Sequence, residues 1–218
     1  MSRNWLDRLR ENPSAALLFV QLAGLLLYPL MDDLASSRAL LNVFGLLVLG
    51  LALRMVRRSP AATWIAVLLA SLVTALQVVQ ALAPSASVTM LISALEALFY
   101  FYAAGSLIAY MMEDQRATTD ELFAAGATFT LLAWAFAHSF ALCQALLPGS
   151  FGPEALPRTW MELLFLSFTT LSGVGLGDIV PLTPMGRALV MLGEFIGVMY
   201  IAVVVSRLIG MSINRGST

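Results

Sequence analysis

Long runs of apolar residues, separated by short polar stretches, set the pattern of this chain. A helix needs about 20 predominantly apolar residues to cross a bilayer, and six segments approach or exceed that length. The pattern predicts an all-α membrane protein with six transmembrane helices. The predicted spans are approximately Ala15–Met31, Ala39–Met55, Ala62–Leu82, Val88–Met112, Leu122–Leu147 and Pro184–Met211.

A shorter apolar segment lies between the fifth and sixth predicted spans. Thr159 and Glu162 have the spacing of a capping box, in which each side chain bonds the other residue's backbone amide. The residues from Trp160 to Thr170 predict a helix of about 16 Å, which is half a membrane. Non-helical backbone beyond such a helix is tolerated at membrane depth only when protein buries it or when it lines an aqueous path. We therefore expect a re-entrant segment here.

The sequence Gly-Val-Gly-Leu-Gly-Asp at 173–178 follows this short helix at once. Glycine adopts positive φ angles without steric cost, so alternating glycines allow successive carbonyl groups to point the same way. A row of carbonyl oxygens aimed at one axis can replace the water shell of a dehydrated cation. The series therefore predicts a cation path built from backbone oxygens.

Composition agrees with a membrane protein. Hydrophobic residues make up 60% of the chain, charged residues 11%, and mean hydropathy is +0.87. The 12 basic residues nearly balance the 13 acidic ones, which gives no reason to expect a nucleic-acid partner. Cys143 is the single cysteine and lies in an apolar run, where we expect a buried structural thiol.

The arginines predict the orientation of the spans. If both termini are cytoplasmic, the outer side keeps only Arg38, Arg158 and Arg187, as the positive-inside rule requires. This orientation places the glycine series on the outer side of a plasma membrane of the prokaryotic, inner-membrane type. The first span is interpreted as a retained helix rather than a signal peptide, because Asp32 and Asp33 follow it without a small-residue cleavage pattern.

Residues 167–181, with Thr183–Arg187 after them, resemble the pore loop of potassium channels, whose usual filter reads Thr-Val-Gly-Tyr-Gly-Asp. The resemblance covers roughly residues 122–211 and is to bacterial six-transmembrane channels without voltage gating. It implies passive K⁺ conduction by a homotetramer, in which three identical subunits and membrane lipids are the partners. K⁺ is then the transported ion, and no organic cofactor is implied.

The resemblance also assigns roles to residues of this chain. Backbone carbonyls of the filter would bind K⁺, and these filter residues are Gly173, Val174, Gly175, Leu176 and Gly177. The residues expected to support the filter are Thr170, Ser172, Asp178, Glu162 and Glu194. Gly197 is a candidate gating hinge, although helix packing explains a glycine there equally well.

Two filter positions differ from the usual form. Gly173 stands where threonine is normal, so the innermost ion site loses a hydroxyl. Leu176 replaces a tyrosine and loses a second hydroxyl. The alternative is therefore a weakly selective Na⁺/K⁺ channel.

The chain divides into two predicted units. Residues 1–121 would form an interfacial helix at 3–12, a four-helix bundle and a connector, and residues 122–218 would form the pore domain. The fourth span contains no arginine and a single charge, Glu96, so a strong voltage sensor is not expected.

Three polar side chains lie within predicted membrane spans, where a polar group needs a partner or a function. Glu96, Gln77 and Gln80 could form a ligand or proton site, or bond between helices. His138, the single histidine, has no partner for a metal site and is interpreted as a packing or hydrogen-bonding residue, with a pH-dependent role left open.

No arrangement of nucleophile, base, metal ligands or paired carboxylates indicates an enzyme. A non-conducting sensor or accessory subunit and a secondary transporter remain alternatives. The sequence does not identify a gating stimulus or a soluble regulatory partner.

Overall fold

The computed structural model describes residues 12–32, 37–113, 118–207 and 209–210. Every regular element in these ranges is helical, so the predicted all-α class is confirmed for them. The predicted interfacial helix at 3–12 lies almost wholly outside the described residues, as does part of the connector. The helices are α2 (Pro13–Asp32), α3 (Ser37–Val56), α4 (Thr63–Leu82), α5 (Ala86–Glu113), α6 (Thr119–Leu146), α7 (Trp160–Leu171), α8 (Pro184–Tyr200) and the π-helical turn η1 (Ile201–Val205).

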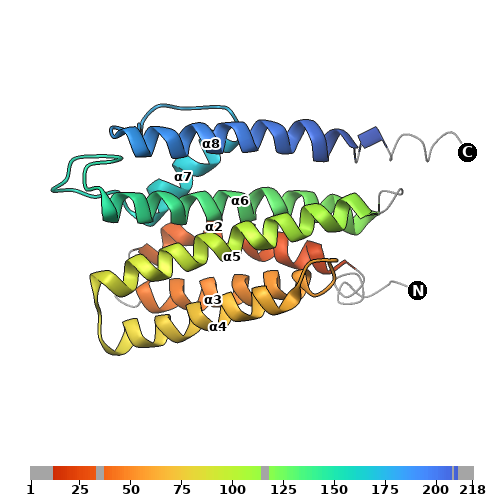
Figure 1. Ribbon diagram of the computed structural model, residues 1–218, viewed down its shortest axis with the longest axis horizontal. Helices are drawn as coiled ribbons and strands as arrows, with labels where there is room; N and C mark the ends of the chain where they lie inside the picture. The colour runs from red at the N-terminus through yellow and green to blue at the C-terminus, as the bar shows by residue number, and fades with distance from the viewer. Residues whose placement is uncertain (1–11, 33–36, 114–117, 208, 211–218) are drawn as a thin grey trace, which may run out of the picture.

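The long helices run along one common axis, and the short α7 lies between α6 and α8 (Figure 1). α6 is the centre of the fold, because α2, α5, α7 and α8 all pack against it. Its middle is almost completely buried, with Trp134, Phe136 and Phe140 in the core. Helices α3 and α4 complete the bundle beyond α5.

The first five predicted spans coincide with helices within a few residues at either end, and the sixth begins at Pro184 as predicted. Its predicted end at Met211 lies outside the described residues. Among the described residues, α4, α5, α6 and the stretch from Pro184 to Val205 are long and apolar enough to cross a membrane. Helices α2 and α3 have 20 residues each, and their described apolar parts are shorter. The part of the chain that the structure describes therefore contains four clear candidate spans, as expected of a membrane protein.

Helix ends follow the local capping chemistry. Thr118 and Glu121 form a capping box at the start of α6, and Thr159 and Glu162 form the predicted one at the start of α7. The Thr183 hydroxyl accepts a hydrogen bond from Gly186 N and caps α8, which opens with a proline. These caps fix the ends of the three helices that surround the glycine series.

Candidate functional site

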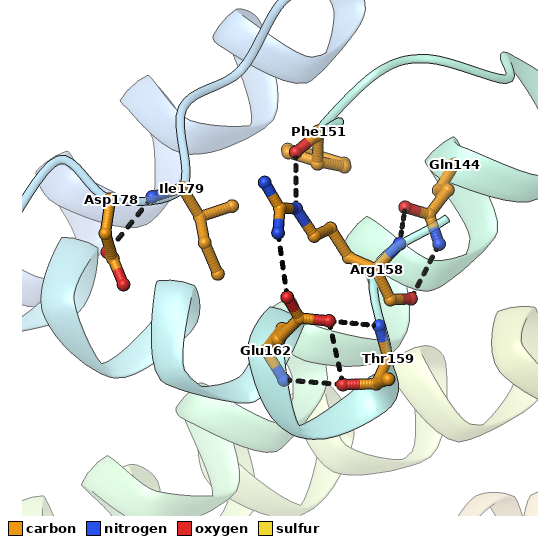
Figure 2. A network of polar contacts seen from close by, with 7 residues as sticks. All are labelled: Gln144, Phe151, Arg158, Thr159, Glu162, Asp178 and Ile179. Carbon is orange, nitrogen blue, oxygen red and sulfur yellow. Dashed lines mark hydrogen bonds and ion pairs between the residues drawn. The ribbon is translucent and has the colours of Figure 1, made fainter. Parts of the chain in front are cut away.

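The start of α7 is held by a polar network around Arg158 (Figure 2). Arg158 Nη1 lies 2.8 Å from Glu162 Oε1, and its Nε donates to the Phe151 carbonyl at 3.1 Å. The backbone of Arg158 also exchanges two hydrogen bonds with the side chain of Gln144 on α6. The loop between α6 and α7 is therefore tied both to the end of α6 and to the first turn of α7.

Glu162 belongs to this network through both carboxylate oxygens. Its Oε2 accepts a hydrogen bond of 2.7 Å from Thr159 N, while Oε1 meets Arg158. The backbone bond from Thr159, and then the bonds and charge of Arg158, lower the pKa of this carboxyl below its ordinary value. Glu162 thus stabilises the first turn of α7 as an anion.

The far end of α7 reaches well along α8. An added Cβ at Gly197 would lie 2.0 Å from the Leu171 carbonyl oxygen, so the two backbones touch there. Gly197 is 13 residues into α8 from Pro184, or about 20 Å at the helical rise. Gly193, one turn earlier, is less crowded, because an added Cβ there would lie in ordinary contact with side chains, 3.5 Å from the Thr170 hydroxyl and 3.6 Å from the Phe136 ring. The last turn of α7 therefore packs against Gly193 and Gly197, which lie on one face of α8.

After the glycine series, the chain returns to the loop that precedes α7. Leu182 N donates to the Ser150 carbonyl at 2.7 Å, and the hydroxyls of Ser150 and Thr183 are 3.0 Å apart. Figure 1 shows α7 running partway along α8 and the following segment coming back to the start of α8. Together, α7 and residues 172–183 form a hairpin-like excursion into the side of the bundle.

The backbone of residues 173–177 alternates between positive and negative φ angles. Gly173, Gly175 and Gly177 have φ angles of 72°, 56° and 77°, and no non-glycine residue among those described has a positive φ. An added Cβ at Gly173 or Gly175 would meet no atom within 4 Å, so conformation rather than space requires glycine here. The alternation predicted from the sequence is present.

The first part of the glycine series is bonded to the last turn of α7. Gly173 N donates to the Thr170 carbonyl at 3.0 Å, and Gly175 N donates to the Thr169 carbonyl at 3.1 Å. The Ser172 hydroxyl donates to the same Thr169 carbonyl at 3.3 Å, while the buried Thr170 hydroxyl bonds back to Ser167 O. Thr170 and Ser172 thus lie directly beneath the series.

The side chains of the series are exposed in the single chain. Val174 and Leu176 are 63% and 64% exposed. Asp178 is exposed too. One of its carboxylate oxygens accepts a hydrogen bond from the next amide, Ile179 N, and the residue lies apart from the network of Arg158 and Glu162 (Figure 2). Glu194 is exposed on α8 and forms no hydrogen bond within the described chain. Their predicted roles stay predictions.

Gly197 has a clear packing contact, since Leu171 occupies the space that a side chain would need. Helix α8 continues without interruption through this residue, and the π-helical turn begins at Ile201. The hinge role proposed for Gly197 is not tested by this geometry.

His138 is buried among aromatic rings and also meets an acidic side chain, as expected of a packing or hydrogen-bonding residue. Its Nδ1 lies 3.1 Å from Glu96 Oε2, and Gln77 donates to the other oxygen of Glu96 at 2.9 Å. Gln80 is not part of this group, because it bonds Thr89 and Ser85 instead. The predicted cluster of Glu96, Gln77 and Gln80 therefore contains His138 in place of Gln80.

Sequence reasoning missed several residues that position the site. Arg158 was noted only as an outer arginine, yet it holds three segments together. Its position four residues before Glu162 was an available signal, because such pairs meet on a helix surface. Gly193 lies one turn before Gly197, which is the small-residue spacing of close helix packing. No sequence signal indicated the bond between Ser150 and Thr183.

A family model described as "Ion channel" matches residues 97–213, which is more than half of the 218-residue chain. The match begins in α5 and takes in α6, α7, the glycine series and α8. The comparisons with curated proteins and with solved structures gave no match.

Proposed function

Because the chain belongs to the ion-channel family, we propose that it is a K⁺-selective channel whose filter is the glycine series at 173–177. Members of this family conduct ions passively, and such channels are built from membrane-embedded helices. The observation that supports K⁺ most directly is the alternation of positive φ at Gly173, Gly175 and Gly177 at the end of a short capped helix. This alternation lets successive carbonyl oxygens face one axis, which is the arrangement that dehydrates K⁺.

The excursion formed by α7 and residues 172–183 is proposed to be re-entrant. The contact between Leu171 and Gly197 puts the end of α7 about 20 Å along α8. This position is near the middle of a span that crosses about 30 Å of hydrocarbon. The carboxyl end of α7 would then aim its negative dipole end at a central cavity. In this proposal six helices cross the membrane, residues 122–218 form the pore domain and the termini are cytoplasmic.

One chain supplies one glycine series, whereas a carbonyl filter of this kind surrounds its ion with four. We infer a homotetramer with four-fold symmetry. The exposure of Val174, Leu176 and Asp178 in the single chain agrees with this inference, since neighbouring subunits would cover or face these residues. Glu194, also exposed, would lie at the same subunit boundary.

Weak voltage dependence is part of the proposal. Helix α5, which corresponds to the fourth span, contains no basic residue. A helix without arginine has no positive gating charge to move through the field. The four helices α2 to α5 would form a peripheral bundle around the pore, with a stimulus other than voltage.

The test is the reversal potential of purified protein in a planar bilayer with K⁺ on one side and Na⁺ on the other. A K⁺-selective channel gives a reversal potential near the K⁺ equilibrium value, and it follows K⁺ when the solutions are exchanged. A reversal potential that does not move on exchange would exclude selectivity.

A weakly selective cation channel is the second candidate, and Gly173 is the residue that favours it. Its φ of 72° is a left-handed conformation that a β-branched residue adopts only with strain, so threonine is disfavoured at this backbone geometry. The innermost ion site would then contain carbonyl oxygens alone. Na⁺ and K⁺ currents of similar size in the same bilayer would support this candidate.

A non-conducting sensor or accessory subunit is distinguished by flux. Tetrameric protein that passes neither Rb⁺ nor Tl⁺ into liposomes, under several activating conditions, would favour it over both channel candidates.

A further inference from the structure

A carboxylate and an imidazole meet in the protein interior between α5 and α6. Glu96 and His138 are each 8% exposed, and their facing atoms are 3.1 Å apart. Gln77, from α4, donates its amide to the second oxygen of Glu96 at 2.9 Å. The Gln77 carbonyl oxygen is buried and has no hydrogen-bond partner. Three helices thus converge on one acid–base pair, beside an unused acceptor.

The imidazole also touches the helix that leads to the glycine series. The His138 ring is 5.7 Å from the ring of Trp160, which is the first residue of α7. His138 also stacks on Tyr100, with the ring centroids 5.6 Å apart and an angle of 18° between the rings. Trp134 packs edge-on against Trp160 at 5.3 Å. A movement of His138 therefore reaches the start of α7 directly.

A surface pocket of about 430 Å³ lies between α5, α6 and the loop that follows α6. Its lining includes Ser93 of α5, Ala141 and Gln144 of α6 and Glu154 of the α6–α7 loop, but neither Glu96 nor His138. Ser93 is three residues before Glu96 and Ala141 three residues after His138, so each lies on the same helix face, one turn away. The pocket brings the surface at the α6–α7 loop to within about one helical turn of the buried pair.

We propose that Glu96 and His138 form a proton-binding site that controls the position of α7 through Trp160, with the pocket as the route for the proton. This inference rests on the proposed channel function. With one proton shared, the pair has no net charge. A second proton leaves an imidazolium beside a neutral acid, and loss of the proton leaves a carboxylate beside a neutral imidazole. Either change puts a net charge in the interior, where its desolvation drives a rearrangement.

The other groups around the pair are mostly unable to titrate. Tyr100 is the third titratable side chain that faces it, and α4 and α7 contribute Gln77 and Trp160. Glu162, the acidic residue of α7, is bonded to Arg158 instead. Among the described residues, no ion pair joins an arginine to Glu96. The charge on the site is therefore set by Glu96 and His138 themselves.

The first experiment measures K⁺ current in a planar bilayer while pH is changed on one side at a time. We expect the wild-type current to change between about pH 5 and pH 8, the range in which imidazole charge responds to its surroundings. The change should be roughly fivefold or more, as ordinary allosteric coupling gives. It should follow the pH on the side of the α6–α7 loop, which contributes Pro148, Gly149, Glu154 and Pro157 to the pocket.

Glu96→Gln and His138→Gln should each abolish this pH dependence, while Glu113→Gln at the exposed end of α5 should keep it. A wild-type current that is independent of pH, or variants that keep the wild-type profile, would overturn the proton site and leave the channel function intact. A response restricted to the opposite side would overturn the route through the pocket.

The second experiment does not need current. His138 is the single histidine, so a chain purified on a tag without histidine and labelled with ¹⁵N-histidine gives one imidazole signal. Fluorotryptophan labelling, with Trp160→Phe to assign the signal, reports on α7. We expect both signals to shift together with pH in wild type and separately in Glu96→Gln. Independent titration in wild type would overturn the coupling, whether or not the protein conducts.

Discussion

The positive φ angles of the glycine series, rather than the space around it, determine which residues fit at these positions. Gly175 has a φ of 56°, and a Cβ there would meet no atom within 4 Å. Gly175→Ala would therefore be strained without any clash, at about 1–2 kcal/mol per residue in the left-handed region. We expect this variant to assemble normally and to lose most of its K⁺ flux, because the carbonyls no longer align. Flux into liposomes, normalised to assembled protein, measures the loss.

Gly105→Ala on α5 is the matched control. An added Cβ is equally free there, but the backbone is helical and needs no glycine. Alanine favours a helix by about 1 kcal/mol over glycine, so this variant should be as stable as wild type or more stable and should conduct. Equal flux in both variants would contradict the assignment of the series as the filter.

The charge of Glu162 predicts a pH dependence at the start of α7. The Thr159 amide and Arg158 lower the pKa of this carboxyl in the folded protein, from an ordinary value of 4.5. Stability from such a group is fully present above the unfolded-state pKa and is lost as pH falls through the folded-state pKa. We expect the unfolding temperature of wild type to decrease as the pH is lowered through about 4.5. Glu162→Gln should lack the part of this decrease that comes from protonation of Glu162.

The side chain of Glu162 is 38% exposed, so water screens the interaction and the shift in midpoint should be small. Glu154→Gln, in the exposed part of the same loop, is the control and should retain the wild-type pH profile. Identical acid profiles for wild type and Glu162→Gln would show that the network around Arg158 does not depend on this charge.

At the scale of elements, the contact between α7 and α8 is as close as backbones allow. A Cβ at Gly197 would lie 2.0 Å from Leu171 O, and the atoms it meets belong to the main chain. Gly197→Ala must push α7 away from α8, and overpacking of this kind typically costs about 1–3 kcal/mol. We expect a lower unfolding midpoint and reduced flux, whereas Gly50→Ala on α3, where a Cβ meets nothing, should show neither. A fully stable Gly197→Ala variant with altered gating alone would instead favour the hinge.

The bounds of the elements could be predicted because local chemistry sets them. Apolar runs gave the long helices, and the capping box of Thr159 and Glu162 gave the start of α7 at Trp160. The predicted end at Thr170 differs from the observed one by a single residue. The fate of 3–12 and of the connector was not tested, because most of these residues lie outside the described ranges.

Contacts between distant parts of the chain could not be predicted in the same way. The sequence gives Glu96 and His138 as two isolated polar residues on separate helices, and only packing of α5 against α6 brings them to 3.1 Å. Arg158 likewise meets Phe151 and Gln144 only because the loop folds back on α6. Periodicity specifies which face of a helix is buried, and it carries no information on which face of another helix it meets.

At the scale of the whole molecule, one face of α8 is not covered by any other described residue of the single chain. Val190, Gly193 and Gly197 face the fold, while Met191 and Phe195 on the other side are 61% and 64% exposed. Exposed apolar residues of a membrane protein face lipid, a neighbouring subunit or a pore. The continuation of α7 and the glycine series beside this helix favours subunits and a pore over lipid.

Substitution of the exposed residues distinguishes these surroundings. Phe195→Ser removes a large side chain from the proposed subunit boundary, while Leu72→Ser makes a comparable change on α4, where Leu72 is 43% exposed and lipid is the expected neighbour. Large aromatic residues contribute strongly to interfaces, so Phe195→Ser should shift mass from tetramer to smaller species, and Leu72→Ser should not. Native mass spectrometry in detergent measures both distributions. Unchanged tetramer in Phe195→Ser, or equal loss in the two variants, would place this face of α8 against lipid and remove the argument that α8 lines a shared pore.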